Sequence, residues 1–245
     1  MSTSTTLTRM AALRKREETA RDTMAFHFDK PAGFEFRPGQ SLDFTLIDPP
    51  ETDAEGNIRT FSIASAPFDP QLMIATRMRD TAFKRVLKTM PLGTAVRIEG
   101  PGGSFTLHKN QAKPGVFLAG GIGITPFFSI IRQTAAEKVP HQLYLFYSNR
   151  RPEDAPFLAA LEDSAQQNPN FHFIPTMTHM DESQREWKGE RGLIDGNMVA
   201  KYVPSLQGPI YYVAGPPGMV TAMRQMLVAA GVDEDDLRTE EFAGY

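Results

Sequence analysis

The chain has 245 residues, of which 41% are hydrophobic and 22% charged, and its net charge is −3 at neutral pH. This length allows one large domain or two of ordinary size, and the composition is that of a globular protein. The small negative net charge gives no support for nucleic acid as a partner. The absence of cysteine excludes disulfides, cysteine-bound zinc, thiolate-held iron–sulfur clusters and a thiol nucleophile.

No segment is long and apolar enough to predict a membrane span, and residues 1–9 lack the apolar centre of a signal peptide. We therefore expect a cytoplasmic protein without a membrane span. The histidines are scattered and form no zinc-binding pair, and no serine lies in a G-x-S-x-G motif. The sequence therefore predicts neither a metal site nor a serine hydrolase.

Apolar and polar side chains alternate in the first part of the chain, at residues 24–28, 42–46 and 72–78. This alternation is typical of half-buried strands, and turns rich in proline and glycine separate the runs. A helix is predicted over residues 81–90, with Phe83, Val86 and Leu87 on one face. Short strands at this spacing predict an antiparallel β-barrel or sandwich.

Apolar runs and helical patterns alternate from residue 116 onward. Strands are predicted at residues 116–119, 143–147, 171–176 and 210–214, and helices at 126–137, 155–167 and 219–230. This order predicts an α/β domain with a doubly wound parallel sheet, which binds ligands outside the carboxyl ends of its strands.

A glycine-rich turn follows the strand at residues 116–119. Gly120, Gly121 and Gly123 end the strand, and Thr125 and Pro126 have the residue types of a helix N-cap and first helical position. Free backbone amides at a helix start suit a pyrophosphate. The alternative is a merely structural turn, because the spacing G-x-G-x-x-P departs from the dinucleotide fingerprint. A second turn, at residues 214–219, is expected at the same edge of the sheet.

Several motifs, in order, resemble those of the ferredoxin–NADP reductase-like flavoproteins. They are Pro38-Gly39-Gln40, Arg59-Thr60-Phe61-Ser62 between strands, residues 100–105, the turn at 120–126, Gly215-Pro216-Pro217 and the aromatic tail at 240–245. The resemblance runs from about residue 19 to the C-terminus. It implies an FAD-binding β-barrel domain at residues 1–112 and an NAD(P)-binding α/β domain at residues 113–245, whose tail returns to the flavin.

The resemblance also assigns roles at the flavin. Arg59 contacts the FAD pyrophosphate, Phe61 packs against the flavin where many members have tyrosine, and Ser62 reaches N5, which accepts the hydride. Thr81 and the amides of the next two residues form a second phosphate contact. The expected FAD-binding residues are Arg59, Thr60, Phe61, Ser62, Thr76, Thr81, Ala82 and Phe83. An isolated arginine or serine at a strand end has the alternative of being solvated or simply packed.

In the second domain the resemblance implies nucleotide contacts from both glycine-rich turns. The residues concerned are Gly121, Gly123, Ile124, Thr125, Gly215 and Pro216, with Ala214 standing where many members have cysteine. Arg150 and Arg151 follow the next strand and could hold a 2′-phosphate, which favours NADPH over NADH. Their alternative is a helix start whose arginines face water.

The C-terminal tail carries two further expected catalytic residues besides Ser62. Phe242 resembles the terminal aromatic that covers the flavin, and Glu240 resembles a nearby carboxylate involved in proton exchange. Tyr245 could replace Phe242 or reach the adenine. The alternative is an edge strand whose aromatic side chains are packed.

The expected function is an FAD-dependent NAD(P)H oxidoreductase that passes electrons to an external acceptor such as a ferredoxin, a flavodoxin or an oxygenase component. The alternatives are a flavin reductase that uses free flavin, and a non-catalytic flavin- or nucleotide-binding subunit. A basic surface around the helix at 81–90 could dock a small acidic carrier or simply be solvated. Its residues are Arg77, Arg79, Lys84, Arg85 and Lys88.

Overall fold

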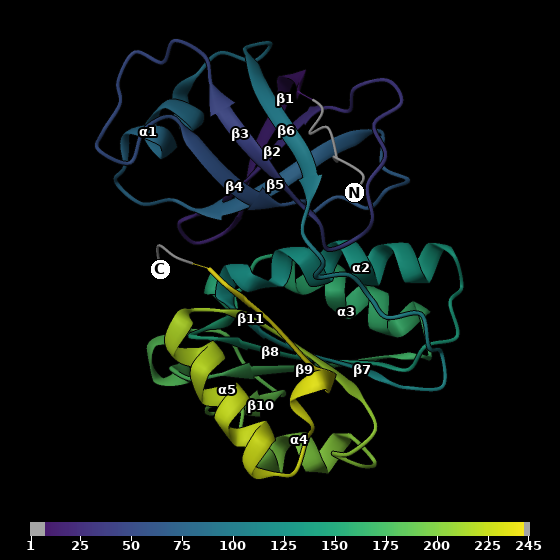
Figure 1. The fold of residues 1–245 in the computed structure, drawn as a ribbon. Helices are drawn as coiled ribbons and strands as arrows, with labels where there is room; N and C mark the ends of the chain where they lie inside the picture. The colour runs from purple at the N-terminus through teal and green to yellow at the C-terminus, as the bar shows by residue number, and fades with distance from the viewer. Residues whose placement is uncertain (1–7, 243–245) are drawn as a thin grey trace.

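A computed structural model describes residues 8–242 as two sheets, one above the other, with helices between and below them (Figure 1). Residues 1–7, part of the segment expected not to be a signal peptide, and Tyr245 lie outside the described residues.

The first sheet is antiparallel and has the strand order β4-β3-β6-β1-β2-β5. Its strands are β1 (Thr8–Ala20), β2 (Thr23–Asp29), β3 (Ser41–Leu46), β4 (Ile58–Ser62), β5 (Gln71–Arg77) and β6 (Ala95–Gly102). Two register shifts in β1 allow this long strand to pair with both β6 and β2. The sheet curls until the Ala64 N–H donates to the Met73 carbonyl at 2.8 Å, just beyond β4. The antiparallel barrel is therefore confirmed.

Helix α1 (Ala82–Thr89) covers one side of this curled sheet. The Thr81 side chain caps it by accepting a hydrogen bond from the Lys84 N–H, as N-cap threonines do. Phe83, Val86 and Leu87 are buried against the sheet, as their helical spacing predicts.

The second sheet is parallel and has the order β10-β9-β8-β7-β11-β12. Its strands are β7 (Gly115–Gly120), β8 (Leu143–Asn149), β9 (Phe171–Met177), β10 (Glu190–Arg191), β11 (Ile210–Gly215) and β12 (Leu237–Glu241). All residues of β7 and β11 are buried. Helices α2 (Thr125–Ala136) and α3 (Leu158–Gln167) cover one face, and α4 (Gly196–Tyr202) and α5 (Pro217–Ala229) the other. This confirms the doubly wound arrangement.

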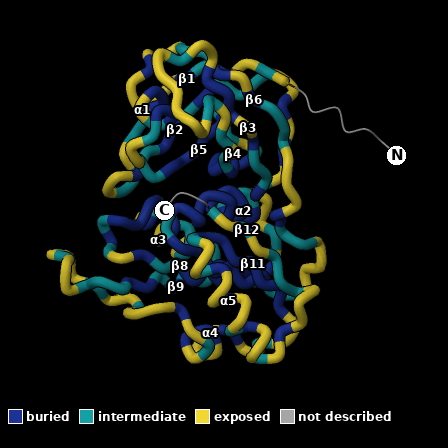
Figure 2. The backbone as a smooth tube through the Cα atoms, turned by 60° about the vertical axis from the view of Figure 1, so that its left-hand side comes forward, coloured by how far each residue is buried: buried dark blue, intermediate teal, exposed yellow. Residues whose placement is uncertain are grey.

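Helix α2 lies between the two sheets and packs against both (Figure 1), and it is buried along most of its length (Figure 2). Ala64 and Ala75 of the first half share a core with Phe127 and Phe128 of α2. The Ser129 hydroxyl donates to the Ser65 carbonyl at 2.6 Å. The two halves therefore share one buried boundary.

Several elements differ from the sequence predictions. Residues 59–62 form β4, whereas they were expected between strands, and β1, β6, β10 and α4 were not predicted. The charged middle of β1 and the glycines of β6 hide the strand pattern. The N-cap prediction for Thr125 is wrong: a 3₁₀ turn, Gly121–Ile124, runs directly into α2, and the Thr125 hydroxyl donates to the Ile122 carbonyl. Helix α3 begins later than expected, after Phe157 with φ 61°.

Candidate functional site

Strand β4 brings Ser62 to the end of the first sheet. Ser62 lies in register with Ser41 of β3, which in turn lies opposite Gly102 of β6. Ser62 is buried. Phe61 is partly buried, with its ring centroid 5.8 Å from that of Phe44 and 5.9 Å from that of Phe83. The Phe61 ring therefore belongs largely to the barrel core.

Arg59 lies beside the start of α1. Its guanidinium stands 5.2 Å from the ring centre of Phe83 and donates to the Glu55 carboxylate at 2.7 Å. It also donates to the carbonyl oxygens of Glu55 and Ile58. The neighbouring Thr60 hydroxyl donates to Asp43. Arg59 thus lies near the first turn of α1 with a carboxylate as its partner, and its contact to FAD stays a prediction.

The first turn of α1 also holds a carboxylate. The Ala82 N–H donates to Asp53 Oδ2 at 2.8 Å, and Asp53 Oδ1 lies 3.8 Å from Arg59 Nη2. The bond from the Ala82 N–H holds the pKa of Asp53 below its usual range. The Asp53 carboxylate occupies a place where these donors could hold an anionic ligand. The donors therefore fit the phosphate oxygens of FAD.

Thr76 was expected to bind FAD, but its side chain is buried and its hydroxyl donates to the Arg77 carbonyl at 3.4 Å. The Phe83 side chain is likewise buried. Of these two, only backbone groups could meet a cofactor in this conformation.

The two glycine-rich turns touch at the carboxyl ends of β7 and β11. A Cβ on Gly123 would lie 2.3 Å from the Ala214 carbonyl oxygen, and one on Gly215 would lie 3.1 Å from the Gly120 nitrogen. Gly121 adopts φ +50°, a conformation that glycine takes at little cost. The predicted meeting of these turns at one edge of the sheet is confirmed, and it requires glycine.

A cleft of about 980 Å³ opens beside these turns. It is lined by Gly120, Gly121 and Pro216, by Asn149 at the end of β8 and Arg150 after it, by residues 191–195 and by α5. Arg77, the last residue of β5, lines it from the first sheet. The Asn149 carboxamide is buried and has no hydrogen-bond partner among the described residues. The cleft thus offers glycine backbone, cations and an unused amide, which suit a dinucleotide.

Comparisons with known proteins agree with this geometry. Residues 117–225 match the family described as the oxidoreductase NAD-binding domain. The chain is 29% identical over 223 residues to a glycine betaine monooxygenase reductase subunit of Chromohalobacter salexigens, covering 90% of this chain and 60% of that protein. It is 27% identical over 218 residues to the reductase component of propane 2-monooxygenase of Rhodococcus jostii, covering 87% and 57%. Residues 117–225 therefore carry an oxidoreductase NAD-binding domain, and the chain as a whole is similar to reductase components of oxygenases.

Solved structures of flavin- and nucleotide-binding proteins share the fold. A ferredoxin NADP⁺ reductase from Neisseria gonorrhoeae with bound FAD and NADP has a TM-score of 0.80 at 18% identity, covering 96% of this chain and 98% of that one. The FAD/NAD-binding domain of a Vibrio cholerae nitric oxide dioxygenase has a TM-score of 0.82, also at 18% identity, with coverage of 96% and 98%. The chain spans about 60% of the length of the curated relatives named above.

The two arginines expected to hold a 2′-phosphate lie differently. Arg150 lines the cleft, with Nη2 3.8 Å from a Glu182 carboxylate oxygen. Arg151 instead donates from Nε and Nη2 to the Asp154 carboxylate at 2.7 and 3.2 Å. Of Arg150 and Arg151, only Arg150 is placed to reach a nucleotide in this conformation. Ile124 and Thr125 are buried, so only their backbone groups could meet a nucleotide in this conformation.

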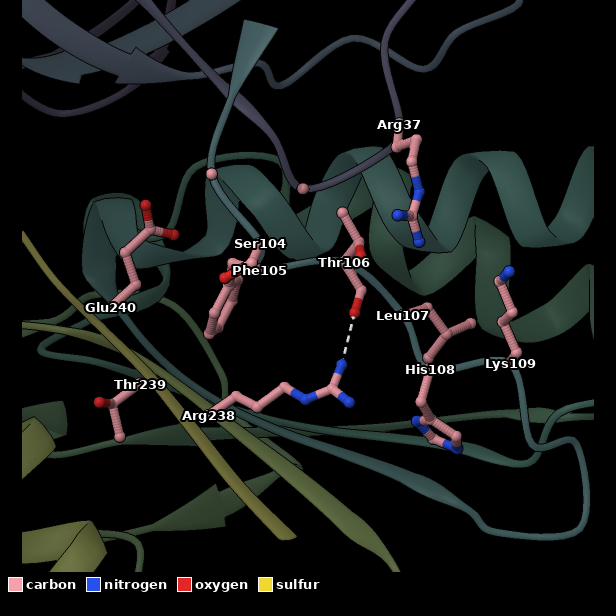
Figure 3. A pocket seen from close by; sticks show the side chains of 12 residues that line it. Arg37, Ser104, Phe105, Thr106, Leu107, His108, Lys109, Arg238, Thr239 and Glu240 are labelled. Atoms are coloured by element: carbon pink, nitrogen blue, oxygen red, sulfur yellow. Dashed lines mark hydrogen bonds between the residues drawn. The ribbon is translucent and has the colours of Figure 1, made fainter. Parts of the chain in front are cut away.

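Strand β12 carries Glu240 into a second cleft, of about 650 Å³, which Figure 3 shows. Gly103 and Phe105 line it directly after the row formed by Ser62, Ser41 and Gly102. Arg238 on the same strand donates to the Thr106 carbonyl at 2.9 Å (Figure 3). Glu240 therefore lies on the side of the molecule where the Ser62 row ends.

Glu240 is perturbed by its surroundings. Its Oε2 atom is buried without a hydrogen-bond partner among the described residues. Burial raises the pKa of Glu240 to about 7. The Phe242 N–H donates to the Gly215 carbonyl at 3.0 Å, which places Phe242 beside the second glycine-rich turn, and its side chain packs partly against the shared core. Tyr245 lies outside the described residues.

The expected basic surface is smaller than its five residues suggest. Arg85 pairs with Glu51 and Asp80, and Arg77 lines the nucleotide cleft. Lys84 Nζ donates to the Arg77 carbonyl at 2.7 Å, and burial lowers the pKa of Lys84 to about 8. This leaves Arg79 and Lys88, too few for a docking patch at this place.

Residues 8–242 contain no group of three or more acidic or histidine side chains that could hold a metal ion. Within the same range no helix has the length and apolar character needed to cross a membrane.

The sequence reasoning missed Asp53 and Asn149, and it assigned Arg77 to the surface. A signal existed for Asn149, which follows Ser148 at the carboxyl end of β8, where α/β sheets bind ligands. Asp53 lies in an exposed loop with no periodic pattern, so only the folded chain reveals its contacts.

Proposed function

We propose that the chain is an FAD-dependent NAD(P)H oxidoreductase with an FAD domain at residues 1–112 and an NAD(P) domain at 113–245. The observation that carries this is the composite cleft, in which Arg77 of the first sheet joins Gly121 and Pro216 of the second. A nucleotide in that cleft would be held by both halves. The cytoplasmic location expected from the sequence stays a prediction.

When bound, FAD would accept a hydride from NAD(P)H at N5 and pass electrons to an external acceptor. The chain's own residues would bind FAD and the nucleotide and orient them. Arg59 and the first turn of α1 would hold the FAD pyrophosphate, and the glycine-rich turns would let the nucleotide backbone approach closely. Ser62 and Phe242 would flank the flavin ring, and Glu240 would hold or release a proton near neutral pH.

We further propose a preference for NADPH. Arg150 and Arg191 both line the cleft, and their guanidinium groups suit a 2′-phosphate. The acceptor is proposed to be a separate protein. The names of the relatives, reductase components of monooxygenases, favour an oxygenase component, with a ferredoxin, a flavodoxin or another small acidic carrier as alternatives.

The test is the visible absorbance of the purified protein, loaded with FAD and kept anaerobic, during titration with NADPH and separately with NADH. Loss of the flavin band at a low concentration of one nucleotide would support both the reductase and its preference. A protein that binds FAD and nucleotide while the flavin band stays unchanged would support a non-catalytic subunit instead. Failure to bind FAD at all would contradict the proposal.

A second candidate is a flavin reductase that uses flavin as an exchangeable substrate. One observation favours it: the donors expected for the FAD pyrophosphate already hold Asp53 and Glu55. Flavin that is lost on gel filtration and turned over in excess of the protein would support this candidate.

A further inference from the structure

Three acidic side chains at two-residue spacing, in the loop between β3 and β4, reach the start of α1. We call residues 51–55 the acidic loop. Glu51 accepts from Arg85 Nη2 at 2.5 Å, Asp53 from the Ala82 N–H at 2.8 Å, and Glu55 from Arg59 Nη2 at 2.7 Å. Two of these three donors, Arg59 and the Ala82 N–H, are those proposed to hold the FAD pyrophosphate.

Two anions cannot share these donors. Asp53 Oδ1 lies 3.8 Å from Arg59 Nη2 while Oδ2 accepts from Ala82, so the carboxylate bridges the space between the arginine and the helix start. A phosphate oxygen in the same place would meet a like charge at contact distance, which is strongly unfavourable.

The acidic loop is attached mainly through its charges. Residues 51–55 are all exposed, and none belongs to a hydrophobic core. Asp48 before the loop and Gly56 after it have positive φ angles, 42° and 72°, and a Cβ on Gly56 would meet nothing within 4 Å. The loop could therefore leave α1 without exposing apolar surface, at the cost of its ionic contacts.

We propose that the acidic loop is an internal competitor of FAD, which binds at α1 only as Asp53 leaves the Ala82 N–H and Arg59. This inference rests on the proposed function and adds regulation of the same site. The loop lowers the affinity for FAD and makes the flavin exchangeable. Any condition or partner that holds the loop away from α1 would raise the affinity for FAD.

The test is the dissociation constant of FAD for the apoprotein, measured by quenching of flavin fluorescence, in the wild type, Asp53→Asn and Asp53→Ser. Both variants keep a hydrogen-bonding side chain but remove the charge. We expect each to bind FAD at least about tenfold more tightly, because the competing charge-assisted contact of Asp53 is lost. Asp80→Asn is the matched control. It removes one exposed carboxylate from Arg85 but touches neither Ala82 nor Arg59, and its affinity should stay within about twofold.

A second measurement reports the loop directly. Hydrogen exchange at residues 51–57 of the wild type should become faster when FAD is added, because the loop leaves α1. Equal or weaker FAD binding by both Asp53 variants, or slower exchange in the loop with FAD, would overturn the inference while leaving the oxidoreductase intact. If neither the wild type nor any variant binds FAD, the proposed function itself fails, and the competition fails with it.

Discussion

Glu240 is a carboxyl group whose burial favours its protonated form. Its pKa is raised to about 7, above the value of 4.5 for the free side chain, and its Oε2 atom has no partner among the described residues. The folded protein therefore binds a proton at Glu240 more tightly than the unfolded chain does. The contribution of Glu240 to the free energy of unfolding therefore falls as the pH rises from about 4.5 to about 7 and then levels off.

Glu240→Gln should remove this dependence because glutamine does not titrate. At pH 8 we expect the variant to be more stable than the wild type by about 1–3 kcal/mol, and the gain should shrink toward zero near pH 4.5. Urea unfolding at several pH values measures it. Parallel pH profiles for the two proteins would show that the Glu240 carboxyl is solvated.

Arg150 and Arg151 are neighbours with different surroundings, so their alanine variants should separate binding from stability. Arg150→Ala should weaken NADPH binding by about ten- to a hundredfold and NADH binding little, since a guanidinium–phosphate contact is worth about 1.5–3 kcal/mol. Arg151→Ala should leave both affinities nearly unchanged but destabilise the protein by about 1–3 kcal/mol, because the buried Asp154 loses its partner.

Isothermal titration with both nucleotides and thermal unfolding of both variants would check this pair. A loss of NADPH affinity in Arg151→Ala alone would mean that Arg151 leaves Asp154 when the nucleotide binds.

At the scale of elements, the contact between the two glycine-rich turns fixes how β7 and β11 end. Gly123→Ala places a methyl group against the backbone of Ala214 and Gly215, which cannot move without disturbing β11. We expect a loss of about 2–4 kcal/mol in the free energy of unfolding, together with weaker nucleotide binding.

Gly218→Ala is the matched control for stability. It lies in the first turn of α5, and a Cβ there would meet nothing within 4 Å. This variant should be unchanged or more stable by up to about 1 kcal/mol, because alanine favours a helix. Denaturant unfolding of the two variants and the wild type would measure these differences in the free energy of unfolding. Equal stability would show that the turns can separate.

Some helices and strands can be predicted from their own sequence, and others cannot. The glycine turn after β7 and the buried runs of β7 and β11 are local patterns, so the parallel sheet and its ligand edge could be predicted. Strand β1 carries charged residues along its middle, which hide the alternation of apolar and polar side chains, and β10 has only two residues. Strand β4 was read as a connection, although its partner β3 was recognised.

The site shows the same division. Gly121, Pro216 and Arg59 lie in motifs that the sequence reveals, and the first two line one cleft in the structure. The contacts of Arg77 and Asp53 join parts of the chain that only folding brings together. Arg151 could be placed by sequence beside Arg150, but its bond to Asp154 depends on the 3₁₀ turn that begins at Pro152.

At the scale of the whole molecule, α2 joins the two halves by packing against both sheets. Arg132 of α2 pairs with Asp69 of the first half, with Nη2 2.9 Å from Oδ1, and neither side chain is fully exposed. A double-mutant cycle with Arg132→Gln and Asp69→Asn should give a coupling energy of about 0.5–1.5 kcal/mol in global unfolding. A coupling near zero would mean that this pair does not help to join the halves.

The edges of the parallel sheet have a consequence for behaviour in concentrated solution. One edge, β10, is only two residues long. The other, β12, carries Arg238, Glu240 and Glu241 among its five residues. Short or charged edge strands are poor templates for an added strand from another molecule. The barrel also joins its own edges where Ala64 bonds to Met73. In its native state the parallel sheet therefore offers no long apolar edge within the described residues, which disfavours self-association by added strands.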